Sequence, residues 1–321
     1  MRNILMFMSV LCLVACGGNS QSSGVIGSPA DGNITVPDQD DSSSDVETAP
    51  NEPSDPIMPS DKLETSLGLD VLQSTSFETV GGTPMKFSVA DNRIVGIEIL
   101  DGFSGAKYDV DADTKSITRT EQLDEGSEYV AKGTLDLYGK SLGLSYADFG
   151  YYKLSEYIND IHQEDIAYTF VGGVLTNKVE KPIQNTEFNG TAIVVLHTWD
   201  GDTRLSKEMI SVANDAGLSF DATSGQTELI ADFTQADNTW YKVTILADNE
   251  YSSQIQFENP TEANIDADFI VSNNRVSGDF SATYYGENGV ASEALVGVST
   301  YLPSETYDGI DMNMVFGGVA K

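Results

Sequence analysis

Hydrophobic and polar residues alternate along most of the chain after residue 61, with a period of two. The pattern is clear at 84–90 and at 93–100, which are joined by Asp91-Asn92, a pair typical of a tight hairpin turn. It is clear again at 241–245 and at 276–284. Because successive side chains of a strand point to opposite faces, this pattern predicts β-strands with one buried face.

Two groups of strands are expected. The first is short and rich in hairpins, with strands at 84–90, 93–100, 107–110, 116–120 and 128–132. The second has longer strands, at 142–152, 166–171, 187–197, 205–212, 227–233, 240–247, 254–258, 265–271, 275–285, 291–301 and 311–316. A short helix is expected at 154–161. Many regularly spaced strands with little helical periodicity predict an all-β barrel or sandwich.

The N-terminal residues have the features of a bacterial lipoprotein signal. Arg2 supplies a positive charge, an apolar run follows at 4–14, and Leu13-Val14-Ala15-Cys16 resembles a lipobox, which is cleaved just before the cysteine. We expect 1–15 to be the signal peptide and Cys16 to carry acyl chains such as palmitate. Each buried CH₂ adds about 0.8 kcal/mol, so several chains make a durable anchor. The alternative is a plain secretory signal with an incidental cysteine.

Residues 17–61 consist mostly of Ser, Asp, Pro, Gly and Asn, with few large apolar side chains. Such a segment buries too little apolar surface to offset the entropy of ordering. We expect a flexible acidic tether with a reach on the order of 40 Å, which would lift the folded part off the membrane. Gly17 stands where an Asp often marks inner-membrane retention, and this favours the outer membrane.

Acidic residues far outnumber basic ones: 50 Asp and Glu face 17 Lys and Arg, for a formal net charge of -33. Residues 62–321 alone carry 41 acids and 16 bases. Such a surface repels phosphate backbones, which excludes nucleic acid as a partner, and it disfavours docking of the folded part on anionic lipids. The acidity suits solubility, a salty habitat or a partner with basic patches.

Signatures of catalysis are missing from the sequence. Both cysteines, Cys12 and Cys16, lie in the N-terminal segment, so the mature domain has no internal disulfide, thiol nucleophile or thiolate metal site. There is no Gly-x-Ser-x-Gly, phosphate-loop or His-Glu-x-x-His pattern. Asp109, Asp111 and Asp113 mimic the start of a calcium loop, but the later positions depart from it, which favours a polar hairpin turn. We expect no enzyme and no metal.

Several stretches carry the motifs of a known family. They are 144–152 (LSYADFGYY), 170–173 (FVGG), 188–192 (FNGTA), 227–233 (TELIADF) and, most specific, 276–280 (VSGDF) followed by Tyr284-Tyr285-Gly286, Ala291, Glu293 and Gly297. They resemble the β-barrel domain of the transferrin-binding protein B family, which comprises Gram-negative surface lipoproteins with haem- or complement-binding relatives. The likeness covers residues 140–321 well. Residues 62–139 resemble the family only in the order of domains, with a small handle-like β domain ahead of a barrel. This chain has one lobe where larger members have two.

The resemblance implies an all-β fold with an eight-stranded antiparallel β-barrel, preceded by a small handle-like β domain and a disordered N-terminal tether. The expected boundaries are 1–15 for the signal peptide, 16–61 for the lipidated cysteine and tether, 62–132 for the small domain and 133–321 for the barrel. Gly278 and Gly286 are expected where strands bend or backbones approach closely. Glu293 and Asp232 are expected to accept backbone N–H bonds at barrel corners.

Histidines and aromatic residues are the remaining candidates for a binding site. Some family members resemble haem scavengers that ligate iron through histidines, and His162 and His197 could act in this way if loops brought them together. The alternative is one solvated histidine and one at the edge of the core. The candidate contacts for a protein partner are Tyr151, Tyr152, Trp199, Tyr284 and Tyr285, and the alternative is again the core. We therefore expect no cofactor, with haem as the alternative.

The expected function is that of a non-catalytic surface lipoprotein, anchored in the outer membrane, that binds a host or environmental protein or an iron or haem carrier. An outer-membrane translocator or receptor would be a further partner. Three alternatives stay open: a complement-evasion or structural surface coat, a haem-binding lipoprotein that uses His162 and His197, and a lipoprotein that faces the periplasm and has no host partner.

Overall fold

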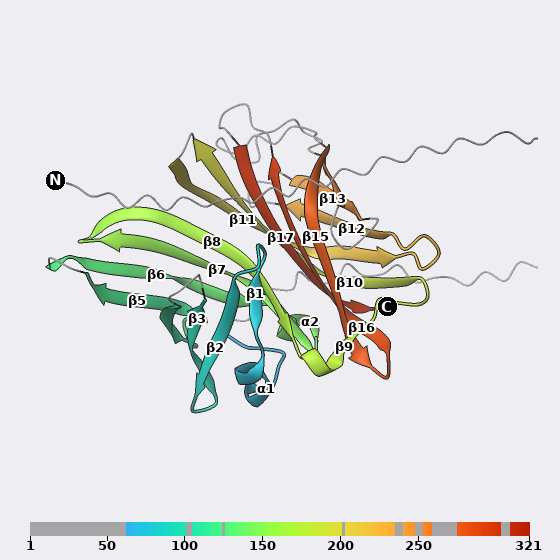
Figure 1. The fold of residues 1–321 in the computed structure, drawn as a ribbon, viewed down its shortest axis with the longest axis horizontal. Helices are drawn as coiled ribbons and strands as arrows, with labels where there is room; N and C mark the ends of the chain where they lie inside the picture. Colours follow the sequence, from blue (N-terminus) through green and yellow to red (C-terminus); the bar gives the residue numbers. More distant parts are fainter. Residues whose placement is uncertain are drawn as a thin grey trace, which may run out of the picture. The chain divides into compact units, whose positions relative to one another are not determined.

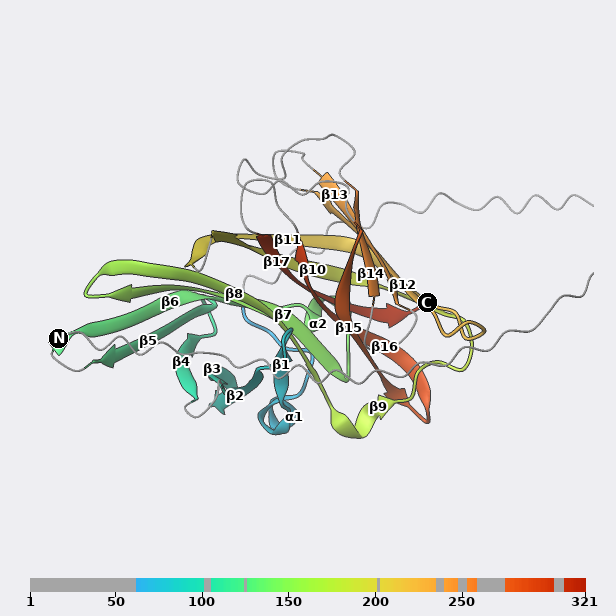
Figure 2. The ribbon, with the colours of Figure 1, turned by 45° about the horizontal axis from the view of Figure 1, so that its top comes forward.

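The computed structural model describes residues 62–100, 105–123, 126–200, 203–234, 240–247, 253–258, 275–302 and 309–321. Figure 1 shows their strands, which form two antiparallel sheets, and Figure 2 shows the same ribbon turned by 45°. Residues 62–321 belong to one compact unit. The expected signal peptide, Cys16, the tether and the strand expected at 265–271 lie outside the described residues.

The first sheet closes into an eight-stranded barrel in which each strand pairs with the next along the chain. Its strands are β1 (Phe77–Thr79), β2 (Pro84–Ala90), β3 (Arg93–Ile99), β4 (Ala106–Asp111), β5 (Ser116–Gln122), β6 (Glu128–Leu137), β7 (Ala147–Ile158) and β8 (Ile161–Gly173). Pairing of β1 with β8 closes the circle, with Phe77 opposite Gly172. Helix α1 (Leu69–Ser74) precedes β1, and helix α2 (Gly139–Leu142) lies between β6 and β7.

The second sheet also closes, through the pairing of β14 with β15. Its strands are β10 (Thr186–Asp200), β11 (Thr203–Phe220), β12 (Thr227–Thr234), β13 (Trp240–Ala247), β14 (Ser253–Glu258), β15 (Arg275–Glu287), β16 (Val290–Leu302) and β17 (Gly309–Ala320). Between the barrels, the 3-10 helix η2 (Leu175–Asn177) leads into the two-residue strand β9 (Lys178–Val179), which pairs with β15.

The all-β class and the closed eight-stranded antiparallel barrel are confirmed. The part that precedes the barrel is larger than expected, because it is itself a closed barrel. The expected boundary after residue 132 falls inside β6, and β7 and β8 complete the first barrel. Sequence patterning grouped these strands with the second barrel because they are long, whereas pairing of β1 with β8 assigns them to the first.

Each barrel has its own apolar interior, and a third apolar cluster lies between the barrels. Inside the first, the rings of Phe77, Phe87 and Phe170 contact one another edge to face, with centroids 4.8 to 6.2 Å apart. Inside the second, inward-facing residues of all eight strands form one cluster. The third cluster, here called the junction, contains Tyr138, Leu144, Ala147, Phe149, Ile193, Tyr285, Leu295 and Val315. The two barrels are therefore joined through a buried apolar contact.

The prediction of a helix at 154–161 is wrong, because β7 continues to Ile158 and a hairpin turn leads into β8. Asn159 and Asp160, at the centre of that turn, have φ values of 51° and 63°. Two positive φ values are the hallmark of the tight turn that matches strand twist, and Asn and Asp tolerate this conformation better than other non-glycine residues. The Asp91-Asn92 turn predicted between β2 and β3 has the same geometry, with φ values of 50° and 60°.

Replacing Asn159 by alanine is expected to lower the free energy of unfolding by about 1–2 kcal/mol. The change places a Cβ-bearing residue without a local hydrogen bond in the left-handed region. It also removes the Asn159 Oδ1 that accepts the Glu128 N–H at 2.9 Å and the Nδ2 that donates to Ser127 Oγ at 3.2 Å. Urea unfolding measures the effect, with Ser127→Ala, which removes only the second bond, as the milder control. Equal effects of the two variants would contradict the turn argument.

Candidate functional site

Glu293 joins the two barrels at the junction, and a second buried carboxylate, Asp148, organises the adjoining part of the first barrel. Glu293, on β16 of the second barrel, accepts the backbone N–H of Ser145 at 2.5 Å and that of Tyr146 at 3.0 Å, just before β7 of the first. Its predicted role as a backbone acceptor is thus confirmed, and the acceptor joins two barrels. Burial raises the pKa of Glu293, an effect that the backbone N–H bonds oppose.

Asp148 is the second buried carboxylate, and sequence reasoning missed it. It lies on β7, is fully buried, and accepts hydrogen bonds from Thr65, Ser66, Gly139 and its neighbour Phe149. These donors tie the segment before α1 and the start of α2 to the first barrel. Burial raises the pKa of Asp148, again against its hydrogen bonds. The role of both carboxylates is structural, because all their partners belong to the scaffold.

The two histidines are not brought together. His162, at the start of β8, is exposed, and its Nε2 lies 3.0 Å from Asp165 Oδ1. His197, on β10, is buried, and its Nε2 accepts the Ala167 N–H at 3.4 Å. Ala167 follows His162 by five residues on the same strand, which places the imidazoles on the order of 15 Å apart at about 3.3 Å per residue. That separation is too long for both rings to bind one iron, so the proposed haem pair is not supported.

Those aromatic candidates whose side chains the structure describes pack within the barrels or at the junction. Tyr152 is buried inside the first barrel, where its ring lies 5.7 Å from that of Tyr168. Tyr284 and Tyr285 are buried as well, so the prediction of an exposed contact is wrong for these three tyrosines. Tyr151 is half-buried and its ring lies 6.4 Å from that of Tyr138 at the junction. The side chain of Trp199 lies outside the described residues.

The carboxylates that mimic a calcium loop belong to a turn, as favoured from the sequence. Asp111 Oδ1 accepts the backbone N–H of Asp113 at 2.9 Å and that of Thr114 at 3.2 Å. Asp113 Oδ2 lies 2.7 Å from Arg93, and that contact lowers the pKa of Asp113. Across the part of the chain that the structure describes, no three His, Cys, Asp or Glu side chains gather closely enough to hold a metal ion.

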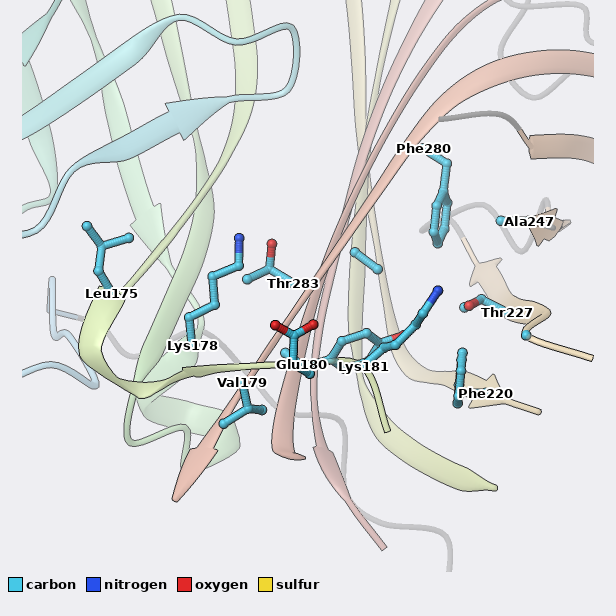
Figure 3. Close-up of a pocket in the computed structure, with 13 residues that line it drawn as sticks. Leu175, Lys178, Val179, Glu180, Lys181, Phe220, Thr227, Ala247, Phe280 and Thr283 are labelled. Atoms are coloured by element: carbon cyan, nitrogen blue, oxygen red, sulfur yellow. The ribbon is translucent and has the colours of Figure 1, made fainter. Parts of the chain in front are cut away.

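A cavity of about 510 Å³ lies at one end of the second barrel (Figure 3). It forms where strands end at different levels, since β12 begins at Thr227 and β13 ends at Ala247 whereas β15 runs on to Glu287. The inward-facing Phe280 and Tyr284 of β15 border this space on one side, although both side chains are buried. We call it the barrel-end cavity.

The exposed lining of the barrel-end cavity is more polar than apolar, and the aromatic residues behind it are packed into the barrel core. The Tyr284 ring lies 5.8 Å from Phe188 and 6.3 Å from Phe220, so three aromatic rings cluster at this end of the barrel core. Ala247 and Ala282 also line the cavity, together with Thr227 and Thr283.

The segment 175–181, here called the strap, covers one side of the cavity (Figure 3). It is held by β9, in which Val179 pairs with Tyr284 and Lys178 with Tyr285. Lys178 and Lys181 are exposed and line the cavity, and among the described residues neither forms an ion pair. Glu180 lines the cavity as well. The strap therefore places two cationic groups and one carboxylate beside the cavity, an arrangement that sequence reasoning missed.

No helix among the described residues is both long enough and apolar enough to cross a bilayer. Neither a scan against protein families nor a search of curated proteins found a match.

The solved structures that match include three of transferrin-binding protein B. Two variants from Haemophilus parasuis Hp5 match with TM-scores of 0.39 and 0.36 at 14% and 13% identity, over 77% of this chain and 44% of theirs. The isotype 1 protein from serogroup B Neisseria meningitidis matches with a TM-score of 0.34 at 15% identity, over 75% of this chain and 52% of that one. The chain thus spans about half the length of these proteins. The likeness is distant, it agrees with the expected resemblance only at the level of fold, and the chain's own strand pairing establishes its two barrels.

Proposed function

We propose that this chain is a non-catalytic binding protein, held at the outer surface of the outer membrane by lipid on Cys16. Its ligand would be a host or environmental protein, or a carrier of iron or haem. The lipobox, the tether composition and the motifs at 276–297 support this assignment.

One structural observation carries the proposal: two closed barrels with filled interiors are joined by a buried junction. A closed barrel has no free edge, and an interior packed with side chains holds no substrate. Recognition is therefore left to strand ends and connecting segments presented by a stiff body. A preorganised surface loses little freedom when a partner docks, which favours affinity.

The charge of the chain narrows the class of partner. A net charge of -25 on residues 62–321 favours a ligand with basic patches and disfavours nucleic acid. Export of such a lipoprotein to the cell surface would also require an outer-membrane translocator or receptor as a partner.

Affinity capture tests the proposal. The chain from residue 17 to 321, immobilised without its lipid, is expected to retain a protein from serum in a saturable way. A haem titration of the same protein tests the alternative in which the ligand carries iron or haem. The control is the same chain unfolded and immobilised, which has the same composition and charge. No saturable retention of a serum protein and no haem binding would contradict the proposal.

The second candidate is a surface coat that acts through acidic bulk or binds complement factors, and the excess of 50 acids over 17 bases favours it. Its binding would depend on long-range charge, so it is expected to weaken steeply as ionic strength rises. Retention that survives about 0.5 M salt, where the Debye length is only about 4 Å, would favour shape-specific capture over the coat.

A further inference from the structure

We propose that a groove between the two barrels binds a short neutral oligosaccharide. The groove has a volume of about 550 Å³ and is lined by β15, β16 and β17 of the second barrel, and by Tyr168 and the turn after β1 of the first. We call it the interbarrel groove. The inference goes beyond the proposed function and does not rest on it, because capture of a protein or of haem requires no sugar site.

The floor of the interbarrel groove is a platform of outward-facing polar side chains. In one row, Asp279 of β15 pairs with Ser299 of β16, which pairs with Asn313 of β17. In the adjacent row, Tyr301 of β16 pairs with Asp311 of β17. Directly opposed residues have Cβ atoms about 5 Å apart, and same-face residues of one strand are about 7 Å apart. The platform therefore has the dimensions of a short oligosaccharide.

The opposite wall of the groove is fixed by contacts that do not involve a ligand. The Ala167 N–H donates to Nε2 of the buried His197 on β10 at 3.4 Å, and the ring of Tyr168 lies 6.1 Å from that of His197. The Val80 N–H donates to the Thr169 carbonyl at 2.9 Å, which holds the turn after β1 beside β8. The groove is therefore preformed, and its volume lies within the range of about 300–1,000 Å³ typical of small-molecule sites.

Hydrogen-bonding capacity is left over along the platform. Ser299, Asp311 and Asn313 are half-buried, yet their side chains have no hydrogen-bond or ion-pair partner among the described residues. Such groups bond to water or to a ligand. Together they offer acceptors, in the carboxylate and amide oxygens, and donors, in the amide nitrogen and the hydroxyl. Sugar hydroxyls donate and accept, so they match this mixed set, whereas a cationic group only donates.

Aromatic and charged residues narrow the class of sugar. Tyr301 is 51% exposed on the platform, and an exposed tyrosine ring can stack on the apolar C–H face of a sugar ring. The charged residues that line the groove, among those that the structure describes, are Asp279 and Asp311. Two carboxylates would repel a sulfated, phosphorylated or carboxylated sugar. The favoured ligand is therefore neutral.

Saturation-transfer NMR with the chain from residue 17 to 321 tests the inference. The probes are three neutral trisaccharides (maltotriose, cellotriose and triacetylchitotriose), anionic trigalacturonate and cationic trilysine. We expect at least one neutral trisaccharide to bind saturably in the millimolar range, and trigalacturonate to bind at least tenfold more weakly. Absence of binding by all three neutral sugars, or equal binding of trigalacturonate, would overturn the proposal. Binding of trilysine alone would show that the aspartates attract cationic peptides, and would overturn it as well.

Paired substitutions locate the site. Tyr301→Ala with Asn313→Ala is expected to weaken the neutral ligand at least tenfold. Asp232→Ala with Leu246→Ala removes an exposed polar and an exposed apolar side chain from β12 and β13, which lie across the barrel from β16 and β17, and is expected to change nothing. Asp279→Ala, at an exposed position, is a second variant that the fold tolerates, with an expected loss of about threefold. Circular dichroism verifies folding. Equal losses in both pairs, or full binding by the Tyr301→Ala, Asn313→Ala chain, would overturn the assignment.

Discussion

Replacing Asp148 by alanine is expected to lower the free energy of unfolding by about 4 kcal/mol, because buried donors lose their only common acceptor. Asp148 Oδ1 accepts the N–H groups of Gly139 at 2.8 Å and Phe149 at 2.9 Å. Its Oδ2 accepts the Ser66 N–H and the Thr65 hydroxyl, both at 2.9 Å. Urea unfolding followed by tryptophan fluorescence and circular dichroism measures the loss. Asp109→Ala, at an exposed position of β4, is the matched control. A cost below about 1 kcal/mol for Asp148→Ala would contradict its structural role.

The cost at Asp148 is also expected to depend on pH. Burial raises the pKa of this carboxyl in the folded chain above its ordinary value of 3.8. The folded state then binds the proton more tightly than the unfolded state, so the associated stabilisation is complete below pH 3.8 and is lost as the pH rises through the raised pKa. Asp148→Asn, which has no such titration, is therefore expected to cost more at low pH than at neutral pH. A cost that increases with pH would contradict the direction of the pKa shift.

Replacing Phe149 by alanine is expected to cost about 3–5 kcal/mol, the range for a buried phenylalanine. Its ring is fully buried at the junction and lies directly over Gly317 of β17. A Cβ at Gly317 would lie 2.2 Å from Phe149 Cε1, so only glycine leaves room for the ring. The variant leaves a cavity between the two barrels, and the loss is measured by urea unfolding.

A double-mutant cycle separates this contact from general core loss. Gly317→Val is expected to cost about 1–3 kcal/mol in the wild-type chain through overpacking, and clearly less in the Phe149→Ala chain, where the ring no longer blocks the methyl groups. Simple additivity of the two changes would show that Phe149 and Gly317 are not in contact, and the junction described above would then be incorrect.

The sequence predicted those features that depend on local chemistry. Alternation of polar and apolar residues identified most strands, and Asp91-Asn92 was placed correctly in a turn because few residues tolerate positive φ. Gly286 was expected where backbones approach closely, and a Cβ there would lie 1.9 Å from the Val290 carbonyl oxygen. Glu293 was expected from the family's motif to accept backbone N–H bonds at a barrel corner, and it accepts those of Ser145 and Tyr146.

Features that depend on long-range pairing could not be predicted. Whether β7 and β8 belong to the first or the second barrel is decided by the pairing of β8 with β1, some ninety residues earlier in the chain. The barrel-end cavity depends on where neighbouring strands end, which alternation does not reveal. Tyrosine is common both in binding surfaces and in cores, and only the direction of the Tyr152 side chain shows that this residue belongs to the core. Likewise, nothing in the sequence indicated how far apart the imidazoles of His162 and His197 lie in the folded chain.

Labelling of intact cells tests most directly whether this chain is displayed as a lipid-anchored surface protein. Cells that produce the chain are stained with an antibody raised against residues 62–321, before and after treatment with an external protease. The account predicts strong staining of unpermeabilised cells and its loss after protease. Staining that appears only once the outer membrane is opened, with a chain that survives the protease, would contradict it.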